Sequence, residues 1–588
     1  MTTDPEIQAA RRSYIELSGR ERARAVLDAG TFRELVGPFD RMESPHLPLQ
    51  GIVPQSDDGV IVARGAIDGE PAIVISLESK FQGGGIGEVG GAKIAGALEL
   101  TLRDRENGIP TRPVLLLETG GVRLQEGNYG LLAIAEIGAA IVALRPHVPV
   151  VSVISGMIGC YGGMSICAAG LSSRLIMTRQ GRLQLNGSEV IEQEAGIAEL
   201  DAADKPLIWS LTGGAQRVAA GFADVLAEDD IPEIAQAIRS AFEAGAPAEN
   251  RSARVEFYRG LLAAVDPRAR LTPEEFRELF RRASEGSPER NEQSPPERPE
   301  SRQDRREQDE APQSAQTART RGRIWFERLS GREDSPAAGG VPSVLCADGE
   351  LDGEAARFVS VVPNPANRFE RAVRGEVGLD EGWAVAQVVR EAVEDDKDSD
   401  RKRAIVAIVD VPSQAYGYRE ELMGIHLACA AAVDAYASAR LAGHPVVALI
   451  VGNAISGAFL AHGMQASRLI AFEDDDVTVQ VMSKPSAARI TRRTIEQLNE
   501  AAEKVPGAAY DVRSFARLGA LHELLPGIDA GSPGAEDLAA VTRSVKAAIE
   551  DARKGPRDLS SRLASEAAGA GRAASIEVRR RLADQWKG

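Results

Sequence analysis

One order of apolar segments, helical patterns and glycines occurs twice in this 588-residue chain. In the first half, apolar segments at 113–121, 149–155 and 173–177 alternate with helical patterns at 127–144 and 164–170, and a glycine turn lies at 156–163. The second half has apolar segments at 404–412, 445–452 and 467–472, helical patterns at 421–443 and 459–466, and a turn at 453–458. The motif Ser-Arg-Leu-Ile stands at both 173–176 and 467–470. This repeat predicts two α/β domains of one fold, with parallel strands that are buried on both faces.

The segment 284–322 separates the two halves and differs from both in composition. Three alanines are its only apolar residues, and the rest are mainly prolines, glutamines and charged residues. Such a segment buries too little surface to offset the entropy of ordering it. The sequence therefore predicts a disordered, flexible linker over 284–322 between domains at 1–283 and 323–588.

Composition and charge exclude several classes of protein. The 86 Asp and Glu outnumber the 69 Lys and Arg, giving a net charge of −17, so nucleic acid is not expected as a partner. The four cysteines have neither disulfide-framework nor zinc-ligand spacing, and the amino terminus lacks a signal-peptide pattern. We therefore expect a cytoplasmic protein without a metal site. The uncharged run 148–173 could span a bilayer, but its proline and glycines favour buried protein core.

The two glycine turns are the strongest candidates for catalytic elements. Backbone N–H groups in such turns can approach a ligand closely, and two donors aimed at one point form an oxyanion hole. The candidate donors are Gly162 and Gly163 in the first half and Gly457 and Ala458 in the second. An alternative interpretation is that these small residues only permit tight packing of a helix on a sheet.

Two further segments are candidates for substrate binding. The glycine-rich loop within 76–100 contains Gly84 and Gly85, and Lys93 follows one turn into the next helical pattern, where it could contact a negatively charged ligand. Gly120 and Gly121 follow the first long apolar segment, and ligands of parallel sheets bind at such strand ends. We expect the first segment to form a flexible loop over an acyl-bearing or phosphate-bearing ligand, and Gly120 and Gly121 to line a narrow channel.

Longer motifs carry a family resemblance. SLESKFQGGGIGEVGGAKI (76–94), ETGGVRLQEGNYG (118–130) and GMIGCYGGMSICAAG (156–170) resemble the β subunit of biotin-independent malonate decarboxylase. VDVPSQAYGYREELMGIH (409–426), GNAISGAFLAHGMQASRLIAF (452–472) and VMSKPSAARI (481–490) are similar to the γ subunit of that enzyme. The resemblance implies a β–γ fusion of two crotonase-like carboxyltransferase domains with ββα-type repeats.

The resemblance also implies a reaction and partners. A malonyl thioester on an acyl carrier protein would be decarboxylated to the acetyl thioester between the two domains, with one oxyanion hole at Gly162 and Gly163 and another at Gly457 and Ala458. The substrate would be carried on a phosphopantetheine-like arm derived from dephospho-CoA, with no covalently bound cofactor. The implied partners are the acyl carrier protein and its transferase subunit, and homo-oligomerisation stays open. The proton donor to the acetyl enolate is not identified, with Tyr161 and Tyr416 among the candidates.

Three other functions are weighed against this one. The nearest is the carboxyltransferase component of a biotin-dependent acyl-CoA carboxylase or decarboxylase, but the chain has neither a four-cysteine zinc ribbon nor an AMKM-type biotinylation site. A Clp-type peptidase with Ser456 as nucleophile would need a nearby base, and no histidine lies in the segment 477–484 where that family places one. The third alternative is a non-catalytic scaffold.

Overall fold

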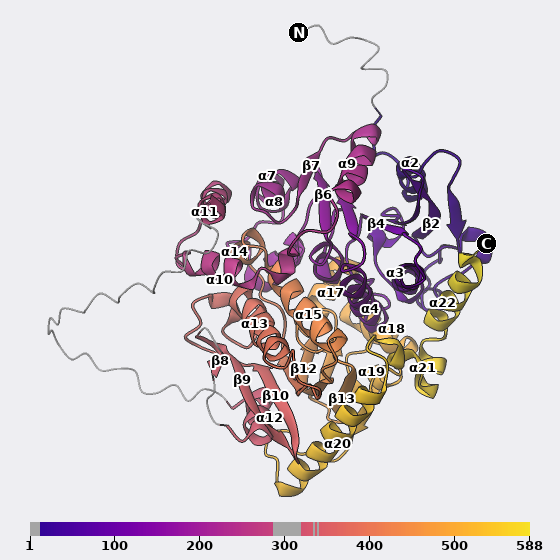
Figure 1. The fold of residues 1–588 in the computed structure, drawn as a ribbon. Helices are drawn as coiled ribbons and strands as arrows, with labels where there is room; N and C mark the ends of the chain where they lie inside the picture. The colour runs from indigo at the N-terminus through magenta and orange to yellow at the C-terminus, as the bar shows by residue number, and fades with distance from the viewer. Residues whose placement is uncertain (1–11, 286–318, 333–335, 338–339, 588) are drawn as a thin grey trace, which may run out of the picture.

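The computed structural model describes residues 12–285, 319–332, 336–337 and 340–587 (Figure 1). The first half forms a seven-stranded sheet in which the strands follow one another in sequence order. Its β2 and β3 form an antiparallel hairpin, and β3 to β7 run parallel. The strands are β1 (Arg33–Leu35), β2 (Val60–Ile67), β3 (Glu70–Leu77), β4 (Arg112–Leu117), β5 (Val151–Ile154), β6 (Arg174–Thr178) and β7 (Val225–Ala227).

The second half repeats this architecture in a sheet with the order β15-β13-β12-β11-β10-β9-β8, in which β14 pairs with β12. In each half a β-hairpin leads into a long helix, α3 (Glu88–Glu106) or α13 (Leu379–Asp395). The predicted α/β fold, with a ββα unit in each half, is therefore confirmed. The strands are β8 (Pro336–Ala337), β9 (Val341–Leu351), β10 (Glu354–Val361), β11 (Ala404–Val411), β12 (Val446–Ile455), β13 (Arg468–Phe472), β14 (Thr478–Gln480) and β15 (Glu523–Leu525).

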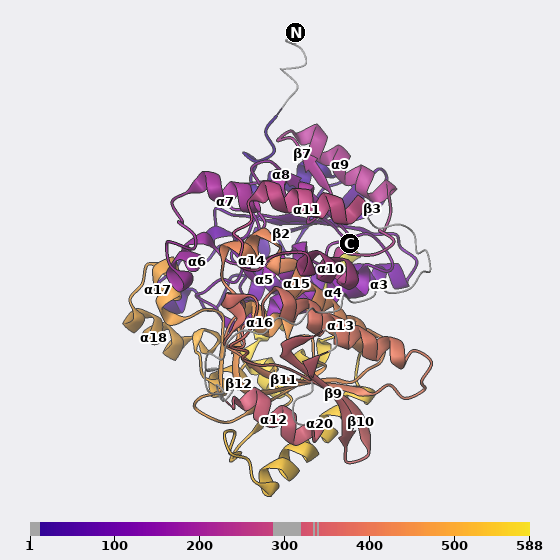
Figure 2. The same ribbon diagram turned by 90° about the vertical axis from the view of Figure 1, so that its left-hand side faces the viewer.

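Two apolar helices, α4 (Asn128–Leu144) and α15 (Ile425–Leu441), pack against each other between the sheets (Figure 2). Both are buried on nearly every side, as expected for helices with few polar residues. The helix predicted from residue 421 begins later because Gly424, with φ +79°, separates it from a short α14 (Tyr418–Leu422). The two sheets therefore face one another across a shared helical layer.

The segments that follow β5 and the predicted end of β12 differ from the sequence prediction. In the first half, α5 begins within the predicted turn (Gly162–Met164) and continues as a π-helix over Ser165–Ala169. In the second half, β12 continues through the first half of the predicted turn, to Ile455, and α16 (Ser456–Ala461) starts directly after it. Ser456 makes this change of direction in one residue, with φ +52°, a conformation that non-glycine residues rarely adopt.

The carboxyl-terminal helix crosses back to the first half. After α20 (Ala535–Lys554) and α21 (Glu566–Gly571), α22 (Ala573–Trp586) packs against α3, where yellow and indigo ribbons meet in Figure 1. Arg572 and Arg579 bind the buried carboxylate of Glu136 on α4, at 2.7 and 2.8 Å. The contacts of α22 therefore tie the end of the chain to the first half.

The predicted linker lies mostly outside the described residues, which end at 285 and resume at 319. Its two ends are helical, in α11 (Pro273–Glu285) and α12 (Arg321–Ser330). The division into domains at 1–283 and 323–588 remains a proposal. Within the described ranges, no helix is long and apolar enough to cross a membrane. The uncharged run at 148–173 instead contains β5, α5 and the π-helix.

Candidate active site between the two halves

A cavity of about 330 Å³ lies where α5 of the first half meets α16 of the second. Both glycine turns contribute to its surroundings, as the sequence predicts. Its wall includes Gly120, Tyr161, Gly162, Gly163, Arg182 and Asn186 from the first half, and Gln414, Tyr416, Ser456 and Leu460 from the second. The carboxyl ends of parallel strands thus bring residues from distant parts of the sequence to one cleft.

The first turn offers one N–H group to a ligand. Gly162 donates its N–H to the carbonyl oxygen of Leu185 at 3.0 Å, whereas the N–H of Gly163 has no acceptor among the described residues. Gly162 has φ +55°, a conformation that favours glycine, and a Cβ on Gly163 would lie 2.7 Å from Cδ1 of Leu460, so that this side chain would have to shift. The predicted pair of donors is therefore reduced to Gly163.

The second turn shows a similar reduction. Gly457 donates its N–H to Oε1 of Gln414 at 3.1 Å. The N–H of Ala458 has no acceptor in the part of the chain that the structure describes. Both residues are buried and directly follow Ser456, which lines the cavity.

The predicted substrate-binding glycines lie together at one side of the cavity. Gly120 lines the wall and donates its N–H to the carbonyl oxygen of Gly83, also in the wall, at 2.9 Å. Gly84, Gly85 and Gly121 directly follow these two residues in the sequence. A Cβ on Gly84 would collide with the backbone of the loop that contains Gly120, and Gly121 has φ +93°. These glycines permit two loops to approach each other closely beside the cavity.

Lys93 does not reach the cavity. Its side chain is fully buried inside the first half, where the ammonium group donates to the carbonyl oxygens of Asp57 and Val60. Burial lowers the pKa of Lys93 to about 8 despite the nearby carboxylate of Asp57. The predicted substrate contact is not supported, because this ammonium group is already engaged in holding the chain before β2.

Arg182 is the one charged side chain among the described residues that line the cavity. Its guanidinium group lies over the rings of Tyr161 and Trp209, at 5.3 and 4.3 Å from their centroids. Its Nε donates to the carbonyl oxygen of Met157 at 3.0 Å. The remaining wall presents amides, hydroxyls and apolar groups, so the cavity is weakly polar.

Two phenols in the wall can donate protons. Burial raises the pKa of Tyr161 and of Tyr416 above the ordinary value, so both are protonated at neutral pH. No histidine lies among the described lining residues. A base for Ser456 is therefore missing from the wall, which argues against the peptidase alternative.

Sequence reasoning missed a chain of side-chain amides. Asn186 donates through Nδ2 to the carbonyl oxygen of Ala415 at 3.0 Å, and Gln414 donates through Nε2 to Oδ1 of Asn186 at 2.8 Å. The backbone N–H of Asn186 donates to the buried carboxylate of Glu421 at 2.6 Å. The only sequence signal was the motif that contains Gln414, because Asn186 and Gln414 are 228 residues apart.

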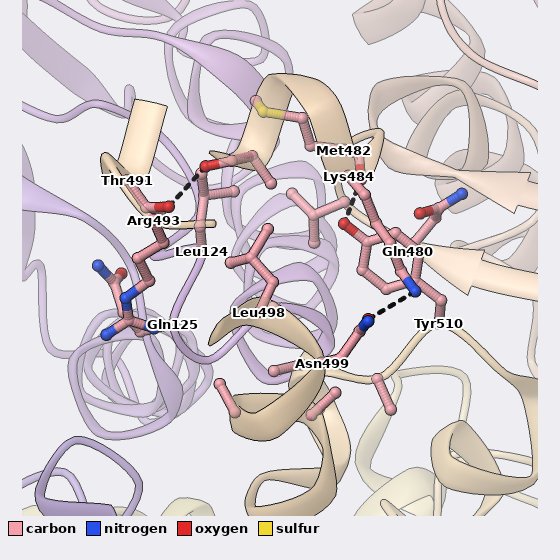
Figure 3. A pocket seen from close by; sticks show the side chains of 18 of the residues that line it. Leu124, Gln125, Gln480, Met482, Lys484, Thr491, Arg493, Leu498, Asn499 and Tyr510 are labelled. Carbon is pink, nitrogen blue, oxygen red and sulfur yellow. Dashed lines mark hydrogen bonds between the residues drawn. The ribbon is translucent and has the colours of Figure 1, made fainter. Parts of the chain in front are cut away.

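A second cavity of about 370 Å³ adjoins the first, and the two share Leu124, Val481 and Met482 (Figure 3). Tyr510 donates its hydroxyl to the carbonyl oxygen of Met482 at 2.7 Å, and Lys484 donates to Oδ1 of Asn499 at 2.8 Å. This second cavity lies between the helices α17 (Lys484–Thr491) and α18 (Ile495–Lys504) of the second half and the segment before α4 of the first half. The two cavities together provide room for an elongated ligand.

Comparisons with known proteins match both halves. Residues 16–284 match the family model "Carboxyl transferase domain", and residues 372–586 match "Malonate decarboxylase gamma subunit". The malonyl-S-ACP:biotin-protein carboxyltransferase MADC of Malonomonas rubra is 44% identical over 230 residues, which are 37% of this chain and 72% of MADC. MADD of the same organism is 38% identical over 192 residues, 32% of this chain and 66% of MADD.

Among solved structures, a Pseudomonas malonate decarboxylase hetero-tetramer in complex with malonate contains a chain that is 56% identical and covered in full. It spans 47% of this chain with a TM-score of 0.46. The identity and coverage of MADC, together with the two family models, determine the assignment. The chain belongs to the malonate decarboxylase family of carboxyltransferase-type enzymes, with its β-like and γ-like parts joined in one polypeptide.

Proposed function

We propose that this chain decarboxylates a malonyl thioester carried on an acyl carrier protein, and that the reaction occurs in the cavity between its halves without biotin. One observation carries the proposal: the free N–H of Gly163 and the turn at Ser456 belong to different halves and border one weakly polar cavity. Family membership supplies the reaction class. The structural arrangement supports a location for it.

The chemistry needs a donor where charge develops. Breaking the carbon–carbon bond releases CO₂ and leaves its electron pair on an enolate, whose charge rests on the thioester oxygen. A preorganised N–H at that oxygen contributes about 3 kcal/mol to lowering the barrier. We assign this donor to Gly163, and we assign return of a proton to the enolate carbon to Tyr161 or Tyr416, which are protonated in the cavity wall.

The weak polarity of the cavity supports decarboxylation. A carboxylate loses its charge when CO₂ leaves, so a wall that solvates it poorly raises the energy of the substrate relative to the transition state. Arg182 is the lining cation, and Tyr161, Trp209 and the carbonyl of Met157 already engage it. We propose that it orients the substrate rather than neutralising the leaving carboxylate.

The adjoining cavity suits the arm that carries the substrate. We propose that a phosphopantetheine-like arm passes Leu124 and Met482 to bring the thioester to Gly163. An acyl carrier protein and its transferase are then the expected partners.

Carboxyl transfer to biotin is the second candidate function, because the names of MADC and MADD both include a biotin protein as acceptor. The two functions can be distinguished by offering malonyl-carrier protein, malonyl-CoA and carboxybiotin to the protein in parallel assays. Decarboxylation predicts acetyl thioester and CO₂ in equal amounts from the carrier-bound substrate, with no effect of avidin. Avidin-sensitive transfer of the carboxyl group to a biotin acceptor would establish the alternative.

A further inference from the structure

The orientation of the Gln414 side chain follows from its neighbours. The N–H of Gly457 can only donate, and the carbonyl of Ala415 can only accept. Asn186 must therefore turn Nδ2 toward Ala415 and Oδ1 toward Gln414, which leaves Oε1 of Gln414 as the acceptor for Gly457. Three hydrogen bonds of 3.0, 2.8 and 3.1 Å form this chain, and reversing either amide would break it.

This chain of hydrogen-bonded amides is also held firmly in place. Gln414 and Asn186 are 5% and 2% exposed. The carboxylate of Glu421 accepts the N–H groups of Leu185 and Asn186 at 3.1 and 2.6 Å, and Arg217, also fully buried, donates to the carbonyl oxygen of Glu421 at 2.8 Å. The acceptor at Gly457 is therefore a fixed part of the cavity.

We propose that Gln414 is a positioning residue that closes the N–H of Gly457 to ligand oxygens, so that this turn offers one donor instead of two to the carboxylate that the substrate loses. This inference rests on the proposed function. The N–H of Ala458 stays free to bind a ligand, so Gln414 reduces the number of free donors in this turn from two to one. Each turn thereby offers one free N–H, that of Gly163 in the first half and that of Ala458 in the second.

The physical reason is the direction in which charge moves. A donor on the leaving carboxylate stabilises the substrate more than the transition state, because that charge disappears as CO₂ forms. A donor on the thioester oxygen has the opposite effect, because charge grows there. A second turn with one donor instead of two therefore favours bond cleavage over tight binding of malonyl.

Gln414→Met tests this directly, because methionine has a similar volume and cannot accept the hydrogen bond of Gly457. We expect KM for malonyl-carrier protein and kcat both to fall, each by roughly tenfold, the size of one hydrogen bond to a charged group. Gln184→Met makes the same chemical change at another buried amide, which is not among the residues of either cavity, and should leave both constants near wild type.

Three results would overturn the inference: unchanged constants in folded Gln414→Met, a raised KM, or a lower kcat at unchanged KM. If Gln414→Met does not fold, Gln414→Glu replaces it, because a carboxylate keeps the acceptor for Gly457. Its KM must then not fall below that of wild type; a lower KM contradicts the inference. Wild-type protein that releases no CO₂ from malonyl-carrier protein would instead refute the proposed function.

Discussion

The guanidinium group of Arg145, in the first half, lies 2.6 Å from the carboxylate of Asp434, in the second, and both side chains are buried. Ser252 of the first half donates its hydroxyl to the other carboxylate oxygen at 2.7 Å. Burial alone would raise the pKa of Asp434, but Arg145 and Arg390 hold it below the ordinary value. The two halves are thus joined by a buried ion pair, in which Arg145 of the first half shares the carboxylate of Asp434 with Arg390 of the second.

Asp434→Asn should lower the free energy of unfolding by about 3 kcal/mol, because it leaves the buried guanidinium group of Arg145 without its counter-charge. Urea denaturation at pH 7 measures this. Glu278→Gln, which removes an exposed pair with Arg281 on α11, is the control and should leave stability unchanged. Equal effects of the two substitutions would contradict the role of Asp434.

Cleaving the chain within 286–318 should leave one active complex. The buried contacts between the halves include Asn128 Nδ2 to the carbonyl oxygen of Val479 at 2.8 Å, and Gln465 Nε2 to that of Ala135 at 2.9 Å. A protease site inserted in this segment allows the test by size-exclusion chromatography and CO₂ release. We expect co-elution and undiminished kcat. Free separation of two fragments, with activity retained in one, would rule out a shared site.

Glu381 should make stability fall as the pH rises from about 4.5 to 7. Burial raises its pKa from 4.5 to about 7, against hydrogen bonds from Ser343 and Asn367, so the folded state holds a proton that the unfolded state releases earlier. Its contribution is complete below pH 4.5 and is lost toward pH 7, by roughly 3 kcal/mol. Relative to Glu381→Gln, wild type should lose this amount in urea unfolding across that range; parallel curves would contradict the shift.

Much of the fold could be predicted from the sequence, because strands and helices buried on all sides leave long apolar runs. The helix predicted at 127–144 corresponds to α4 at Asn128–Leu144, and the segment at 404–412 to β11 at Ala404–Val411. The start of α16 could not be predicted, because it depends on Ser456 adopting φ +52°. The crossing of α22 to the first half depends on contacts with Glu136, a residue more than 400 positions away.

The site was predictable only in part. Glycine turns identify where a backbone can approach a ligand, and Gly162 and Gly163 do border the cavity. Local sequence does not reveal which N–H groups already have an acceptor. For Gly162 and Gly457 the acceptors are Leu185 and Gln414, which come from other elements. The burial of Lys93 likewise depends on tertiary packing.

Met482→Trp should separate the two cavities, because Met482 borders both. A larger side chain at position 482 should hinder a substrate carried on a long arm more than a short thioester. We expect KM for malonyl-carrier protein to rise roughly tenfold, while KM for malonyl-N-acetylcysteamine changes little. Ala502→Trp, in the wall of the adjoining cavity alone, serves as the control and should affect the carrier-bound substrate less. Equal losses for both substrates would mean that the arm does not pass Met482.

We propose above that the N–H of Gly163 stabilises the enolate in the cavity shared by both halves. The most direct measurement is the kcat of CO₂ release from malonyl-carrier protein by Gly163→Val, compared with Gly260→Ala on α10 (Val255–Ala263), where an added Cβ meets nothing within 4 Å. Because the introduced side chain would also press on Leu460, Gly163→Val combined with Leu460→Ala separates packing from catalysis. We expect at least about a hundredfold lower kcat in both Gly163 variants, with native circular dichroism, and a wild-type rate in Gly260→Ala. A wild-type kcat in either Gly163 variant would contradict it.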